Sequence, residues 1–500
     1  MIEITQTKSG RGLGVVATED LHPGIFGLKV ITEEALIVFP TLEDQSGGSS
    51  KVPKFLEPCP QVYADWYRYL QEPQSIKDRI LMLYNEIDCP QANALKNYLH
   101  KYKDGINDTE EIDKDEKQIL NHIGEFVQFT MVIRFNSVEL QPPARDGNGP
   151  GPSYGHGLFD QACKMNHSCK PNCVWFTTQD GKSKEVRAIS IIRKHEELTV
   201  DYNGNVLDAT PQRRDDLFQA KGFLCECVRC AADHDDTRRF KCITQQTNSQ
   251  CTGYHFLCQP TYSKAPSLMD CNCCGRRPTE DYVHKVMKEE MKLVREINEL
   301  DSIADTDGIV SVKDRIKRLD PPHTYHSLAE KCYLLQGELY SALGEYKSSA
   351  EAFAKAIDCR IEILGTDYWS QATAFTCERL GDALKYVNIE EAEEAYRRTV
   401  RALELMRGGG HSDPYVKCAM KKLLTVQQSS VVLSSDSLPR EECLKGIADA
   451  PEGPPVTDFP CRLCGKPSII PTSSRDALSY CCEFHKQMHH TAVRDRSIAF

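Results

Sequence analysis

The sequence lacks a run of about eighteen or more apolar residues, the length that a membrane-spanning helix needs, so no membrane segment is expected. Its first residues are acidic and lack the basic and apolar regions of a signal peptide. An excess of positive charge is also missing, because the 500 residues carry a formal net charge of −11 at pH 7. Proteins that bind nucleic acid usually present a basic face, so direct nucleic-acid binding is not expected.

Cysteine, by contrast, is plentiful: the chain has 23, and most of them lie in short clusters. In a chain without an export signal, such clusters indicate zinc sites in a reducing compartment rather than disulfides. We therefore expect the protein in the cytoplasm, the nucleus or both.

The first cluster has the spacing Cys-x-Cys-x2-Cys at Cys225, Cys227 and Cys230. A structural zinc site takes four ligands arranged as a tetrahedron, so one more is needed. The segment at 166–173 reads Asn-His-Ser-Cys-Lys-Pro-Asn-Cys and offers Cys169 as the fourth ligand. A zinc ion bound by these four thiolates would tie that segment to a much later part of the chain.

A second group of cysteines follows at 242–274. The pair Cys271 and Cys274 has the spacing of a zinc knuckle, whereas Cys242 and Cys251 lie further apart than usual. We interpret these four as a degenerate zinc ribbon. The alternative is that they are reduced, buried cysteines, which pack as small hydrophobic side chains.

Three motifs occur in order: Asn-His-Ser-Cys-x-Pro-Asn at 166–172, Glu-Leu-Thr-x-x-Tyr at 197–202, and the first cysteine cluster. In this combination the chain resembles the SET-domain lysine methyltransferases and, within them, the SET-and-MYND (SMYD) family. The resemblance implies an enzyme that transfers methyl groups from S-adenosylmethionine (SAM) to a lysine-bearing segment of a protein substrate. The alternative is a SET-derived scaffold that binds protein partners through a helical domain and a tail finger, with little catalysis.

The resemblance also assigns roles to individual residues. Tyr202 would be catalytic, with its hydroxyl beside the methyl group and the incoming amine, and Phe223 would stack on the adenine. The glycine-rich turn at 10–13 would let backbone amides approach the cofactor closely, although such turns alone are weak signals. Asn136 can equally be a plain asparagine at the start of a strand. The residues implied to bind SAM are Gly10, Arg11, Gly12, Leu13, Asn136, Met165, Asn166, His167, Tyr202 and Phe223.

In SMYD proteins a zinc-binding MYND finger usually follows the first strands, but here it is missing from that place. The tail of the chain resembles a truncated MYND finger, with fewer ligands than the two zinc ions of a complete finger need. Its predicted zinc ligands are Cys461, Cys464, Cys481 and His485.

Apolar spacing predicts helices over most of 54–135 and over 281–424. The segment at 118–135 is expected to be one apolar helix, with a strand beginning at Arg134. Tyr333, Gly337 and Phe353 resemble one tetratricopeptide repeat unit, and 380–396 resembles a second, imperfect one. Stacked repeats of this kind form a concave face, so protein partners of this region are implied.

The fold class is therefore α+β: a β-rich SET domain with a helical insertion, a post-SET zinc module, and an α-helical, tetratricopeptide-like C-terminal domain. The expected parts are a SET domain at 1–220 with its insertion at about 54–135, zinc modules at 221–280, helical repeats at 281–424, a linker at 425–459 and a zinc-finger-like tail at 460–500.

Overall fold

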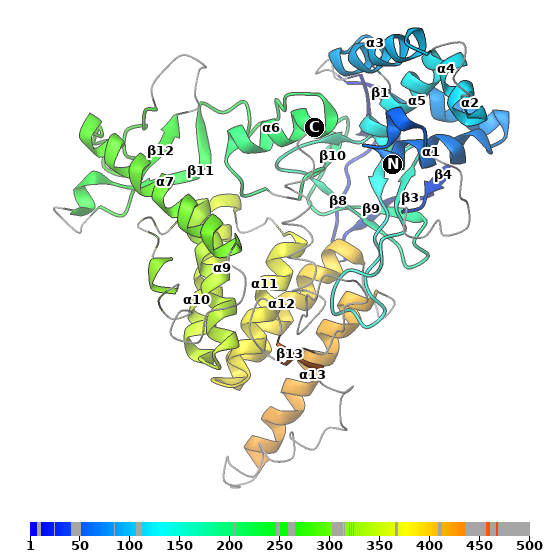
Figure 1. Ribbon diagram of the computed structural model, residues 1–500. Coiled ribbons are helices and arrows are strands. Elements are labelled where there is room, and N and C mark those ends of the chain that lie inside the picture. Colours follow the sequence, from blue (N-terminus) through cyan, green and yellow to red (C-terminus); the bar gives the residue numbers. More distant parts are fainter. Residues whose placement is uncertain are drawn as a thin grey trace. The chain divides into compact units, whose positions relative to one another are not determined.

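A computed structural model gives the architecture of the chain (Figure 1). It divides into two compact units, and most of the first is the N-terminal part Met1–Val206 together with Pro211–Cys230. The finer five-part division remains a prediction, and the predicted tail quartet lies outside the described residues. The structure describes residues 1–7, 12–24, 26–41, 52–84, 86–106, 113–204, 206–246, 251–258, 266–302, 314, 316–319, 321, 323, 325–365, 369–408, 413–435, 457–460 and 467–468.

Short strands make up the β-rich part of the first unit. They are β1 (Ile2–Gln6), β2 (Leu13–Ala17), β3 (Leu28–Glu34), β4 (Ile37–Phe39), β5 (Val138–Glu139), β6 (His156–Leu158), β7 (Asn166–His167), β8 (Cys173–Thr177), β9 (Ser183–Ala188) and β10 (Glu197–Val200). Two antiparallel sheets have the orders β3-β9-β8 and β4-β6-β5. The third has the order β1-β2-β10-β7, and β10 pairs antiparallel with β2 but parallel with β7.

Alternate side chains of these strands form a core. Val15 and Ala17 of β2 are buried, as are Leu198 and Val200 of β10. Because successive side chains of a strand point to opposite faces, this spacing places one face of each strand in the core. A slip of one residue would expose the buried set, so burial fixes the register of β10 and the position of the residues that follow it.

The expected helical insertion is present, and its centre is aromatic. Trp66 packs its ring edge-on against Phe126 and Phe129, with ring centres 5.2 and 5.4 Å apart. Tyr69 lies 4.7 Å from Phe129. The helices are α1 (Pro60–Leu70), α2 (Gln74–Leu81), α3 (Pro90–Asp104), α4 (Lys114–Asn121) and α5 (Ile123–Asn136).

Two expectations for this region are wrong in detail. The single helix predicted at 118–135 is interrupted at His122, whose φ of −121° and ψ of 37° are not helical. The strand predicted from Arg134 begins only at Val138, because the last turn of α5 continues to Asn136. The side chain of Asn136 donates to the carbonyl of Val132 at 2.8 Å and so stabilises that turn.

The second unit begins with a hairpin and continues as helices. Among the described residues, no helix is long and apolar enough to cross a bilayer. The last long helix runs past the boundary expected at 424 and ends at Ser435. The elements are β11 (His234–Lys241), β12 (Tyr254–Cys258), α7 (Glu280–Ser302), α9 (Ser327–Ala342), α10 (Tyr346–Leu364), α11 (Gln371–Leu384), α12 (Ile389–Arg407), α13 (Pro414–Ser435), β13 (Thr457–Pro460) and β14 (Pro467–Ser468).

The repeat-like glycines mark places where helices approach closely. A Cβ atom added to Gly337 of α9 would lie 2.6 Å from the ring of Phe353 on α10. Likewise, a Cβ atom on Gly381 of α11 would lie 2.7 Å from the ring of Tyr396 on α12. Glycine therefore makes room for an aromatic ring of the next helix in both pairs, which accounts for the weak repeat in the sequence.

Gly337→Ala should destabilise the helical region. Alanine in a helix normally gains about 1 kcal/mol over glycine, but overpacking a filled site costs about 1–3 kcal/mol. We expect the free energy of unfolding to fall by up to about 2 kcal/mol, measured by circular dichroism in denaturant. The double variant Gly337→Ala/Phe353→Leu frees the space and should lose less than the two single variants together. A Gly337→Ala protein that is more stable than the parent would contradict this packing.

Candidate active site

The segment at 166–173 is bound along β10. Asn166 and His167, which form β7, lie opposite Thr199 and Val200 in a parallel pairing. The amide of Ser168 then donates to the carbonyl of Val200 at 3.0 Å. These bonds hold the loop against the end of the strand that leads to Tyr202.

Asn172 completes this attachment from the other end of the loop. Its side-chain oxygen accepts from the amide of Thr199 at 2.8 Å, and its side-chain nitrogen donates to the carbonyl of Glu197 at 2.8 Å. The side chain of Asn172 thus bonds two backbone groups of β10, as the backbone of a neighbouring strand would. The sequence analysis gave Asn172 no role, although its place directly after a proline in a tight loop was a signal.

Tyr202 lies at the centre of the predicted site residues. Its hydroxyl donates to the carbonyl of Met165 at 2.5 Å, and its backbone amide donates to Nδ1 of His167 at 3.1 Å. The rings of Trp175 and Phe223 lie 5.7 and 6.4 Å from its ring, the first stacked and the second edge-on. Burial raises the pKa of Tyr202, so its hydroxyl keeps its proton at neutral pH.

Asn166 joins the loop to the end of the glycine-rich turn. Its side-chain nitrogen donates to a carboxylate oxygen of Glu197 at 2.7 Å and to the carbonyl of Leu13 at 3.3 Å. Gly12 has a φ of +83° and open space where a Cβ would stand, and the Leu13 side chain is 45% exposed. Gly12 and Leu13 are thus accessible beside Asn166, while Gly10 and Arg11 lie outside the described residues.

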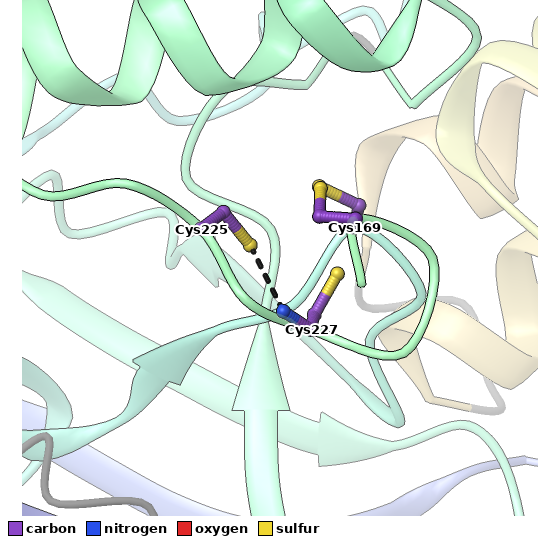
Figure 2. Close-up of side chains that lie close together, drawn as sticks. Cys169, Cys225 and Cys227 are labelled. Carbon is purple, nitrogen blue, oxygen red and sulfur yellow. Dashed lines mark hydrogen bonds between the residues drawn. The ribbon is translucent and has the colours of Figure 1, made fainter. Parts of the chain in front are cut away.

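The four cysteines predicted as the first zinc site lie close together in the structure. The four sulfur atoms, all in buried residues, lie within 4.8 Å of one another. Figure 2 shows Cys169, Cys225 and Cys227 grouped together, with the amide of Cys227 donating to the sulfur of Cys225 at 3.5 Å. Zinc with Zn–S bonds of about 2.3 Å would hold sulfurs about 3.8 Å apart, so the quartet is of the right size. The residues are Cys169, Cys225, Cys227 and Cys230.

A model of the SET domain family matches residues 12–203, which include the loop, β10 and Tyr202. The chain thus carries a SET domain and is similar to SET and MYND domain proteins. It is 31% identical over 103 residues to a SET and MYND domain-containing protein of Dictyostelium discoideum, covering 20% of this chain and 19% of that one. It is 37% identical over 82 residues to the N-lysine methyltransferase SMYD2 of Homo sapiens, covering 16% and 18%.

A longer match reaches beyond the SET domain. The chain is 22% identical over 339 residues to the histone-lysine N-methyltransferase ASHR1 of Arabidopsis thaliana, covering 62% of this chain and 66% of that one. The aligned stretches thus span between about a fifth and two thirds of the length of these relatives.

The side-chain nitrogen of Asn136, within the SET domain, makes hydrogen bonds to the protein backbone. It donates to the carbonyls of Val132 and Tyr84, at 2.8 and 2.7 Å, and the residue is 5% exposed. Its own carbonyl accepts from the thiol of Cys163 at 3.0 Å. The side-chain nitrogen therefore stabilises the last turn of α5 and ties it to the backbone of Tyr84, and a contact with SAM remains a prediction.

The second cysteine quartet comes together at the β11–β12 hairpin. The sulfurs of Cys242 and Cys274 lie 3.6 Å apart, and those of Cys251 and Cys271 lie 3.7 Å apart. The amide of Cys242 donates to the carbonyl of Gly253 at 3.0 Å, so the hairpin closes the wide gap in the sequence. The predicted ribbon ligands thus share one place, and zinc binding there remains a prediction.

Cys227→Ser should remove the zinc ion predicted at the first quartet. The zinc content of the full chain, measured by mass spectrometry of the metal, should fall by about one ion per chain, with a lower melting temperature. Cys173→Ser is the matched control, because Cys173 is equally buried on β8 but belongs to neither quartet. Equal zinc content in the two variants would show that the quartet does not bind the metal.

Proposed function

We propose that the SET domain transfers methyl groups from SAM to lysine side chains of proteins. The observation that carries the proposal is the position of the Tyr202 hydroxyl, which is held on the carbonyl of Met165 among aromatic rings. Two of the relatives with the same domain are named as lysine methyltransferases, which supports the reaction class.

The residues around Tyr202 suit a sulfonium cofactor. Aromatic faces attract cations, and the rings of Tyr202, Trp175 and Phe223 pack together here. The exposed turn at Gly12 and the loop at Asn166 would hold the rest of SAM. Bound there, SAM would supply a methyl group that an amine can accept.

The incoming lysine must arrive without its proton. An exposed lysine has a pKa of about 10.4, so less than about 0.1% of it is neutral at pH 7. Buried, apolar surroundings disfavour the charged form and raise the neutral fraction. The Tyr202 oxygen, which keeps its proton and donates it to Met165, has lone pairs that can accept a hydrogen bond from the amine. Its contribution is then orientation in a fixed electrostatic environment.

The substrate is proposed to be a protein segment that presents a lysine. The net charge of −11 fits a basic partner, and the helical second unit is the proposed contact for protein partners. We further propose that the protein acts in the cytoplasm, the nucleus or both. Labelled SAM incubated with peptide arrays and with whole lysate would identify the substrate.

Tyr202→Phe tests the mechanism. We expect the single-turnover rate of methyl transfer to fall about 10²–10³-fold, by analogy with the loss of one oriented donor in other active sites. The SAM affinity, measured by calorimetry, should stay within about a few-fold, because the ring and its packing remain.

Tyr69→Phe is the matched control, since Tyr69 is a fully buried tyrosine of the same unit whose hydroxyl bonds Glu125. It should lose stability and keep the rate. A Tyr202→Phe protein with the parental rate would remove Tyr202 from the mechanism, and a parent protein that binds no SAM would favour the scaffold function.

A further inference from the structure

A lysine of the chain itself lies at the candidate active site. Lys221 is the last residue of α6 (Thr210–Lys221), and its Nζ lies 6.0 Å from the centre of the Tyr202 ring. Gly222 follows with a φ of +76°, a conformation that suits glycine at the end of a helix. This turn ends α6 and leads directly into Phe223, which packs edge-on against the same tyrosine.

The Lys221 amine is held by hydrogen bonds to backbone carbonyls rather than by an ion pair. Its Nζ donates to the carbonyls of Ser137 and Arg134, at 3.1 and 3.3 Å. Among the described residues, the titratable groups that act on it are Cys163 and Arg134 and no carboxylate, and the ring of Tyr202 faces it. Backbone carbonyls and an aromatic face can hold an amine in either protonation state, whereas a carboxylate would lock the charged form.

These surroundings give the amine an unusual protonation state. Burial lowers the pKa of Lys221 to about 8. An amine with that pKa is about one-tenth neutral at pH 7, at least a hundred times more than an exposed lysine. A neutral amine at the catalytic tyrosine is what a lysine methyltransferase needs of its substrate, and the Lys221 amine lies over the ring of that residue.

We propose that Lys221 is an internal methyl acceptor, modified in cis by the SET domain that contains it. The inference rests on the proposed function. The Nζ lone pair forms a bond to the methyl carbon of SAM as the carbon–sulfur bond breaks. The sulfur keeps the bonding electron pair and becomes a neutral thioether, and the nitrogen releases one proton to water. Because the acceptor is part of the same chain, its effective concentration does not depend on the protein concentration.

Lys184 provides a matched comparison within the same unit. Lys184 is buried whereas Lys221 is half-buried, and burial lowers the pKa of both to about 8. However, the Nζ of Lys184 lies over the ring of Trp175, 5.8 Å from the ring centre, whereas the Nζ of Lys221 lies over the ring of Tyr202 itself. Low basicity is thus common to both lysines, and only Lys221 combines it with a position at the candidate catalytic tyrosine.

The test is the full-length protein incubated with isotope-labelled SAM and no added substrate, followed by residue-level mass spectrometry. We expect label on Lys221, no label there after Lys221→Arg or Lys221→Met, and unchanged label after Lys184→Arg. Tyr202→Phe should slow the labelling about 10²-fold. The first-order rate constant should stay constant when the protein is diluted about tenfold, as for an intramolecular step.

A second measurement does not depend on turnover. In lysine-labelled protein, the NMR signal that disappears in Lys221→Arg should titrate with a midpoint near 8 rather than near the ordinary value of about 10.4. A midpoint at the ordinary value would overturn the inference, as would label that appears only on lysines other than Lys221. If the protein methylates an added substrate and Lys221 stays unlabelled, the inference fails while the proposed function stands. If it binds no SAM and methylates nothing, both fail.

Discussion

The candidate active site depends on the pairing of one loop with one short strand. The loop at 166–173 lies along β10 through the parallel ladder of β7 and through the side chain of Asn172, which bonds two backbone groups of the strand. These contacts fix Met165 and Tyr202 relative to each other, so that the hydroxyl of one residue reaches the carbonyl of the other. Neither segment could hold the tyrosine alone, because each is only a few residues long.

The cysteine quartet at 169–230 extends this arrangement to a third segment. Phe223 and Lys221 lie just before the cysteines at 225–230, and Cys169 lies within the loop itself. Bound metal would therefore fix the wall that carries Phe223 against the loop that carries His167. The zinc would act at a distance from the chemistry, by limiting how far these segments can separate.

Sequence reasoning predicted what depends on spacing and residue type. The sulfurs of each predicted cysteine quartet lie together, and Tyr202 contacts Met165 and His167, while zinc and SAM binding there stay predictions. The break of the predicted helix at His122 was missed, because the apolar pattern continues through it and only the backbone angles there differ. The structural contacts of Asn136 were missed because they reach Tyr84, far away in the sequence. Lys221 looks like an ordinary cation at the end of a helix, where such residues are favoured, and only the folded chain places it over Tyr202.

Both ring nitrogens of His167 have contacts within the site, and Nδ1 also lies 3.6 Å from a carboxylate oxygen of Asp201. Nδ1 accepts the amide proton of Tyr202, so the ring proton must be on Nε2, which lies 3.2 Å from the sulfur of Cys169. The ring is therefore held in a single tautomer, with one edge on the backbone of Tyr202 and the other on the sulfur of Cys169. The ring thus links the predicted zinc ligand Cys169 to the backbone that carries Tyr202, so a change in the geometry of the quartet would reach the tyrosine through one rigid side chain.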